Sequence, residues 1–269
     1  DVLGLEVAAH PVRLERALGG SGNLLIIDGE AGVGKTRLAY ELLRRAGERG
    51  ATVISATCQQ LEQQLPFASL ADSLGRYLYG LPDESVRCLP QSSLTQLAQI
   101  VPSLQDRGAG ILPPSADAAG VADENRQRLI DGIVSLFAAM ATLRPLVLLL
   151  DDLQWSDPDT LAVLSRLAQR LGDLPILLLL SYRNDDLSEN DALGTLLHAF
   201  NRSHAHSLLH LTRFTAEQVT EFVALHWQEE AASAPRLGSL LFSATQGNAL
   251  FVAEALRDLE ERHATDPSH

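Results

Sequence analysis

One short segment, residues 29–36, constrains the fold of this chain more than any other feature of its sequence. It reads GEAGVGKT and matches the pattern G-x-x-x-x-G-K-[ST]. Glycines at these spacings let the backbone curl so that successive N–H groups point inward at phosphate oxygens. A helix that starts at the end of the loop adds its positive N-terminal dipole. The segment therefore predicts a strand–loop–helix unit that binds phosphate.

The residues on either side of this loop fit that unit. The apolar run at 24–27 precedes it and predicts a buried strand. Residues 35–46 follow it and predict a helix with one apolar face, formed by Leu38, Leu42, Leu43 and Ala46.

Other apolar runs indicate the rest of a sheet. Residues 146–150 and 176–180 are short and continuously apolar, which is typical of central strands in a parallel sheet. Weaker strand patterns lie at 52–56 and 207–211. A helix is expected after Asp157-Pro158, ending near Gly172. Because strands alternate with helices, we predict an α/β fold: a P-loop NTPase with a doubly wound parallel sheet of about five strands.

The strand signals stop after residue 211. Thr215 and Gln218 form a capping box that opens a helix, and helical stretches follow near 236–244 and 248–260. We therefore predict a nucleotide-binding domain over 1–211 and a small helical lid over 212–269. Residues 103–120 are rich in Gly, Pro, Ala and Asp without periodicity, which indicates a mobile loop.

The phosphate loop assigns roles to its residues. Lys35 is placed to neutralise β- and γ-phosphate charge, and Thr36 to offer its hydroxyl to Mg²⁺. The remaining loop residues are expected to form the phosphate cradle: Gly29, Glu30, Ala31, Gly32, Val33 and Gly34. These features predict ATP or ADP with Mg²⁺ as ligands.

Two carboxylates follow the strand at 146–150. Asp151 and Asp152 fall at the carboxyl end of a parallel strand, where ligands bind in open α/β sheets. Asp151 is expected to hold Mg²⁺ through its water shell. Asp152 is expected to orient or deprotonate an attacking water. An acidic turn after a buried strand is the plainer alternative for this pair.

Composition restricts the setting. The chain has 269 residues and a net charge of −13, which argues against direct nucleic-acid contact by this fragment. Two cysteines are too few for a disulfide framework, and no apolar run is long enough to span a bilayer. The first residue is Asp1, without a basic signal region, so we expect a piece of a larger cytoplasmic protein.

Several segments together resemble a known family. LVLLLDDLQWSD at 146–157 and GEAGVGKT resemble the ATPase module of the STAND class, the signal-transduction ATPases with numerous domains. More narrowly, they resemble the AAA-type module of large bacterial LuxR-type transcriptional regulators and related multidomain regulators. LPFASL at 65–70, SYR at 181–183 and TQGNALF at 245–251 agree with this resemblance, in the family's order.

The resemblance implies further roles. Arg183 would sense the γ-phosphate from a strand between the two motif-bearing strands, and Asp152 would stand at the catalytic acid position. Gly247 and Ala249 would lie near the adenine in the helical lid. The chain also departs from the family, because Ala249 replaces the usual Pro and the opening GLEV lacks the usual Arg. Asp152 is one methylene shorter than the Glu of fast ATPases, which favours slow hydrolysis.

We therefore expect a nucleotide-controlled switch, with ATP closing the lid and hydrolysis releasing it. Its partner would be an attached effector domain, and the resemblance implies a transcriptional regulator as the parent protein. Self-association is a second expected partner interaction. One alternative is a scaffold that binds nucleotide with little or no hydrolysis. A small-molecule kinase is the other, although the sequence has no motif for a phosphate acceptor.

Overall fold

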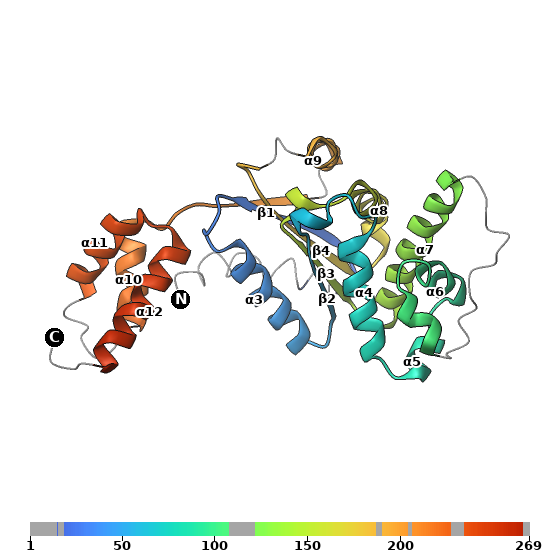
Figure 1. Ribbon diagram of the computed structural model, residues 1–269, viewed down its shortest axis with the longest axis horizontal. Coiled ribbons are helices and arrows are strands. Elements are labelled where there is room, and N and C mark those ends of the chain that lie inside the picture. The colour runs from blue at the N-terminus through green and yellow to red at the C-terminus, as the bar shows by residue number, and fades with distance from the viewer. Residues whose placement is uncertain are drawn as a thin grey trace.

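The computed structural model describes residues 15, 19–107, 122–186, 190–203, 206–226 and 234–265. A five-stranded parallel sheet with the order β2-β3-β4-β1-β5 forms its centre (Figure 1). The strands are β1 (Asn23–Gly29), β2 (Thr52–Thr57), β3 (Leu146–Asp151), β4 (Ile176–Arg183) and β5 (His206–Leu211). Each contains one of the five apolar segments, so the predicted fold class is confirmed.

Burial explains why these runs form strands. All six residues of β3 are buried, and in β4 only the last residue, Arg183, is partly accessible. Side chains of a strand alternate between its two faces. In β1, Leu24 and Ile26 therefore join the apolar cluster on one face, while Leu25 and Ile27 join the cluster on the other. A strand covered on both faces must be continuously apolar.

Helices cover both faces of the sheet. On one face, α3 (Lys35–Glu48) packs its predicted apolar stripe against Leu25 and Ile27. The helices that contribute to the larger cluster on the other face are α4 (Ala68–Gly80), α6 (Gln91–Leu97), α7 (Ala122–Leu143), α8 (Pro158–Ala168) and α9 (Asp191–Ser203). The short helix α5 (Asp83–Arg87) joins this group through Val86.

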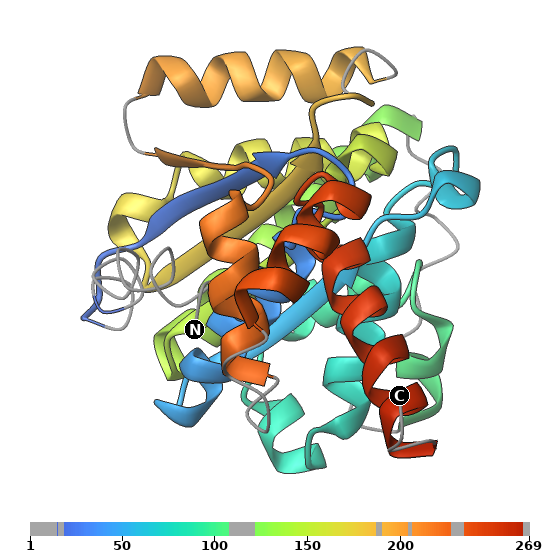
Figure 2. The same ribbon diagram turned by 90° about the vertical axis from the view of Figure 1, so that its left-hand side faces the viewer.

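The three last helices form a separate group. They are α10 (Ala216–His226), α11 (Ala234–Thr245) and α12 (Ala249–Thr265), and they bury their own cluster around Val219, Val223 and Val252. Figure 1 shows them beside α3, joined to the sheet by the chain that leaves β5, and Figure 2 shows them from the front. The predicted capping box is present, with Thr215 N donating to Gln218 Oε1 and Gln218 N donating to Thr215 Oγ1. The domain boundary at residue 211 stays a prediction.

Two predicted boundaries differ from the structure. Helix α8 ends at Ala168, and Gly172 lies instead in a 3₁₀ turn, η4 (Leu171–Asp173), which directs the chain into β4. The expected mobile loop at 103–120 starts too early, because η2 (Pro102–Arg107) is a 3₁₀ helix held by the buried Leu104. The rest of that expected loop, from 108 to 120, lies outside the described residues.

Candidate functional site

The loop between β1 and α3 has the backbone that its glycines make possible. Gly29, Gly32 and Gly34 have φ values of 146°, 78° and 106°. Residues with a side chain larger than hydrogen rarely adopt such backbone φ angles. Gly34 is the residue that immediately precedes α3, so the loop delivers the free N–H groups of that helix to the space inside the curl.

Lys35 lies inside this curl. Its side chain is almost entirely buried, and Nζ donates to the carbonyl oxygens of Gly29 and Glu30 at 2.8 and 2.7 Å. Burial lowers the pKa of Lys35, and the charge of Asp152 is the strongest influence in the opposite direction. The ammonium group thus points along the loop's inner rim, where phosphate oxygens could replace the carbonyls.

Thr36 and Asp151 meet across the site. Thr36 Oγ1 donates to Asp151 Oδ2 at 2.7 Å, although the two residues are 115 positions apart. Ser181 on β4 donates to Asp151 Oδ1 from the other side. A hydroxyl and a carboxylate are oxygen ligands of the kind that Mg²⁺ takes beside water and phosphate. The residues present therefore fit the metal that the sequence predicts.

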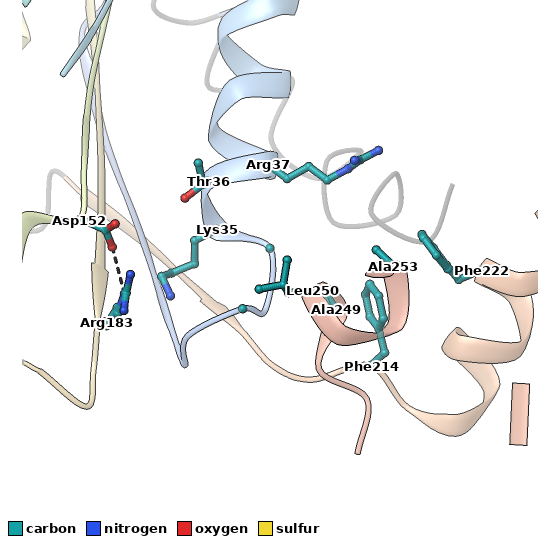
Figure 3. Close-up of a pocket in the computed structure, with 12 residues that line it drawn as sticks. Lys35, Thr36, Arg37, Asp152, Arg183, Phe214, Phe222, Ala249, Leu250 and Ala253 are labelled. Carbon is teal, nitrogen blue, oxygen red and sulfur yellow. Dashed lines mark hydrogen bonds and ion pairs between the residues drawn. The ribbon is translucent and has the colours of Figure 1, made fainter. Parts of the chain in front are cut away.

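Asp152 lies next to Arg183. The guanidinium Nε of Arg183 donates to Asp152 Oδ1 at 3.2 Å (Figure 3). Asp152 has a left-handed backbone with φ 58°, and its N–H donates to Ser181 Oγ at 3.2 Å. This contact arises because β4, which ends at Arg183, lies between β3 and β1. The strand position implied for Arg183 is therefore confirmed.

A cavity of about 480 Å³ extends from the loop to the C-terminal helices. Its polar end is formed by Gly32, Gly34, Lys35, Thr36, Arg37, Asp152 and Arg183. Its other end is apolar and is formed by Phe214, Phe222, Ala249, Leu250 and Ala253 (Figure 3). Most small-molecule sites combine a largely apolar wall with a few polar groups in this way.

The two lid residues of the prediction have different places. Ala249 lines the apolar end of the cavity. Gly247 is not among the described residues that line it, but its carbonyl oxygen accepts from Phe214 N at 2.8 Å. With φ 73° it also passes so close to Phe214 that an added Cβ would lie 2.0 Å from the Phe214 carbonyl oxygen. Gly247 therefore supports a lining residue.

The C-terminal helices contact the phosphate loop directly. Asn248 Nδ2 donates to Ala31 O, and Leu250 N donates to Gly32 O, both at 2.9 Å. Arg213, which precedes α10, pairs with Glu30 at 2.7 Å. These contacts tie the lid to the loop at three points, and the sequence did not predict any of them.

The sequence prediction gave no site role to eight residues of the site: Arg37, Gln154, Ser181, Phe214, Phe222, Asn248, Leu250 and Ala253. Gln154, Ser181 and Asn248 lie inside segments that carry the family resemblance, and that position is the signal that could have found them. Phe214 and Phe222 have no such signal, because each is an ordinary apolar residue in or near a helix.

Parallel strands, a phosphate-type loop and a carboxylate beside Thr36 define a P-loop nucleotide-binding fold. A protein-family model described as "AAA ATPase domain" matches residues 12–180, more than half of the chain. The chain therefore belongs to the AAA ATPase domain family. No curated protein sequence matches it.

Among solved structures, the likeness to Cdc6p supports the fold, and two further structures are similar with lower TM-scores. Cdc6p from Pyrobaculum aerophilum has a TM-score of 0.51 and 17% identity, over 84% of this chain and 49% of that one. Domain III of the DnaA replication initiation protein from Thermotoga maritima has a TM-score of 0.49 and 16% identity, over 98% and 86%. A STAND protein with a tetratricopeptide repeat sensor from Pyrococcus horikoshii gives 0.43 and 15%, over 90% and 28%.

The chain thus spans about half of the Cdc6p chain and about a quarter of the STAND protein. Within the described ranges, none of the helices has the length and apolar character needed to cross a membrane.

Proposed function

We propose that this chain is an Mg²⁺-ATP-binding module that hydrolyses ATP slowly and works as a switch within a larger regulator. One observation carries the proposal: the phosphate loop and the C-terminal helices line the same cavity. The Thr36–Asp151 pair lies at the loop end of this cavity, and Asn248 binds the loop directly. A ligand in that cavity would contact the sheet domain and the lid at the same time. Its presence would therefore bias how the two parts are held.

Binding follows from the two ends of the cavity. The loop N–H groups, the start of α3 and Lys35 would hold the phosphates. Thr36 and Asp151 would hold Mg²⁺, which supplies charge neutralisation of the phosphates when bound. The base would enter the apolar end, between Phe214 and Ala249. An aromatic wall stacks on any base, so this arrangement supports nucleotide binding without fixing adenine as the base.

Hydrolysis would depend on Asp152 and Arg183. Asp152 would take a proton from the attacking water as the water oxygen bonds to the γ-phosphorus. The bond from the γ-phosphorus to the bridging oxygen breaks, and ADP and inorganic phosphate are the products. Arg183 now pairs with Asp152, and a γ-phosphate would compete for its guanidinium. Asp152 is a general base with a short side chain, and it is paired with an arginine. Both features favour slow turnover of ATP.

The regulatory setting rests on the family resemblance and is part of the proposal. The module would act on an effector domain in the same protein, most simply a transcriptional regulator in the cytoplasm. Contact with DNA would belong to that other domain. Self-association of the module is also part of the proposal.

Thermal unfolding with and without Mg²⁺-ATP tests the binding. A ligand at about a hundred times its Kd adds roughly 2.7 kcal/mol to the free energy of unfolding. We expect the Tm to rise by about 5–10 °C for a domain of this size. Lys35→Ala should lose this shift. Lys35→Arg keeps the positive charge and shows whether that charge alone is sufficient for ATP binding.

Phosphate release tests the hydrolysis separately. Wild-type protein should release phosphate from ATP, and Asp152→Asn should bind ATP but lose turnover. Binding without turnover in the wild type would favour the nucleotide-binding scaffold. Transfer of phosphate to a metabolite instead of water would favour the small-molecule kinase. The absence of any Tm shift at millimolar ATP would contradict the proposal as a whole.

A further inference from the structure

Gln154 is a fully buried polar residue that contacts two residues of the site. It lies in η3 (Leu153–Trp155), the short turn that follows Asp152, and its side chain is inaccessible to solvent. A buried amide is retained where its polar atoms have partners. Its side-chain nitrogen has a partner in Asp152, which directly follows β3, and its side-chain oxygen has a partner in Arg183, which ends β4.

The amide of Gln154 links the two proposed catalytic residues. Its Nε2 donates to Asp152 Oδ1 at 2.9 Å. Its Oε1 accepts from the backbone N–H of Arg183 at 3.1 Å. One uncharged side chain therefore fixes both the carboxylate of Asp152 and the backbone from which the Arg183 side chain extends.

The backbone of Gln154 is itself held from the far side. Its carbonyl oxygen accepts from Asn190 Nδ2 at 3.2 Å. Asn190 is buried, also donates to Ser156 O at 3.0 Å, and caps the start of α9 by accepting from Leu193 N. A residue fixed at its main chain and at its side chain is rigid, which is what a group that orients a catalytic carboxylate requires.

The two carboxylate oxygens of Asp152 differ in their hydrogen bonds. Gln154 and Arg183 both contact Oδ1, at 2.9 and 3.2 Å. Within the part of the chain that the structure describes, no hydrogen bond is formed at Oδ2. The carboxylate is thus oriented through one oxygen, and the other oxygen is left without a hydrogen bond among the described residues.

We propose that Gln154 is a positioning residue for ATP hydrolysis, which holds Asp152 Oδ1 and so directs Oδ2 at the attacking water. This inference rests on the proposed function. The Arg183 contact would be given up when a γ-phosphate arrives, whereas the Gln154 contact is neutral and can persist through the reaction. Gln154 would then keep Asp152 in place at the moment when Arg183 moves.

Gln154→Met is the first test, because methionine has a similar length and removes both hydrogen bonds. Misplacement of a catalytic group by about 1 Å costs on the order of a hundredfold in rate. We expect kcat for ATP hydrolysis to fall about ten- to hundredfold, while the Kd for Mg²⁺-ATP stays within about threefold. Gln96→Met, on α6, is the matched control, since the Gln96 side chain pairs with Gln99 and not with the site.

Gln154→Glu adds a second measurement, the pH dependence of kcat, which would not change if Gln154 had only a structural role. The introduced carboxyl can still accept from the Arg183 N–H, but when ionised it repels Asp152. When protonated it can donate to Asp152 as the amide does. The ratio of wild-type to variant kcat should therefore shrink as the pH is lowered from 8.5 to 6, and Gln154→Met should show no such trend.

The outcomes separate this inference from the proposed function. Turnover in the wild type with kcat unchanged in Gln154→Met would overturn the positioning role alone. A loss of kcat in parallel with a loss of binding and Tm, with a flat pH ratio in Gln154→Glu, would assign Gln154 a structural role and also overturn it. A wild type that binds ATP through Lys35 without turnover would overturn the proposed hydrolysis first, and this role with it.

Discussion

The side-chain amide of Asn248 donates a hydrogen bond to the carbonyl oxygen of Ala31 at 2.9 Å, across 217 positions of sequence. Asn248 also caps α12, because its Oδ1 accepts from the N–H groups of Leu250 and Phe251 at 3.2 and 3.4 Å. One side chain thus begins the last helix and fixes that helix to the phosphate loop. Loop and lid are coupled at this residue.

Substitution Asn248→Asp separates the two functions of this side chain. A carboxylate still caps the helix, but it cannot donate to Ala31 and it places negative charge beside the loop. We expect the Tm of the free protein to change by less than that of Asn248→Ala, whose lost cap costs about 1 kcal/mol. Affinity for Mg²⁺-ATP, measured by calorimetry, should fall by about tenfold in Asn248→Asp. Equal affinity in wild type and Asn248→Asp would show that the lid contact does not contribute.

A single methyl group added at Gly247 should strongly lower the stability of the fold. Gly247 has φ 73°, and a Cβ there would lie 2.0 Å from the Phe214 carbonyl oxygen. We expect Gly247→Ala to lower the free energy of unfolding by about 2 kcal/mol or more, since strain and overpacking add. Gly194→Ala is the matched control: a Cβ on Gly194 in α9 meets nothing within 4 Å, so that change should be neutral or slightly stabilising. Urea unfolding of both variants measures the difference.

Much of the fold can be predicted from the sequence because its signals are local. Residues 146–150 and 176–180 are apolar at every position, and the loop at 29–36 has its glycines where the backbone needs them. Each of these patterns is complete within a few residues. The order of the strands is less local, and the resemblance implies only one part of it, the place of the Arg183 strand between the two motif-bearing strands.

Long-range contacts could not be predicted. Helix α7, which has 22 residues, contains many good helix formers, but Gly132 and the β-branched residues Ile130, Ile133 and Val134 lower the helix propensity of its middle. Packing against β3 and the neighbouring helices stabilises it instead. The partners of Gln154 depend likewise on where η3 meets β4. A sequence pattern shows that a residue is polar, but not which buried atom it satisfies.

Ionisation of the buried Tyr182 should lower the stability of the protein at high pH. Burial, with a contribution from Asp28, raises the pKa of Tyr182 to about 12. The unfolded chain releases this proton near pH 10, so between about pH 10 and 12 the folded state binds more protons than the unfolded state. Stability from this group is therefore complete below about pH 9 and is lost as the pH rises through 12.

The measurement compares urea unfolding at pH 8 and at pH 11.5. We expect Tyr182→Phe to lose less free energy of unfolding over this interval than the wild type, by up to about 2–3 kcal/mol. The exposed Tyr40 provides the control, and Tyr40→Phe should follow the wild type. The buried Cys58, whose pKa burial raises to about 11, contributes a similar loss in every variant and so cancels in the comparison. Parallel losses in Tyr182→Phe and wild type would contradict the prediction.

Phe222 tests where the base of the nucleotide lies. Its ring lines the apolar end of the cavity, with its centroid 6.1 Å from that of Phe214. Stacking of a base on an aromatic ring is worth about 1–3 kcal/mol, so Phe222→Ala should weaken ATP binding by about tenfold or more. Inorganic triphosphate lacks a base, and its affinity should change by less than about twofold. Phe251→Ala is the control, because Phe251 is 55% exposed on α12 and does not line the cavity. An equal loss for ATP and triphosphate would mean that Phe222 acts on the phosphate loop through lid packing, and the base would then have to lie elsewhere in the cavity.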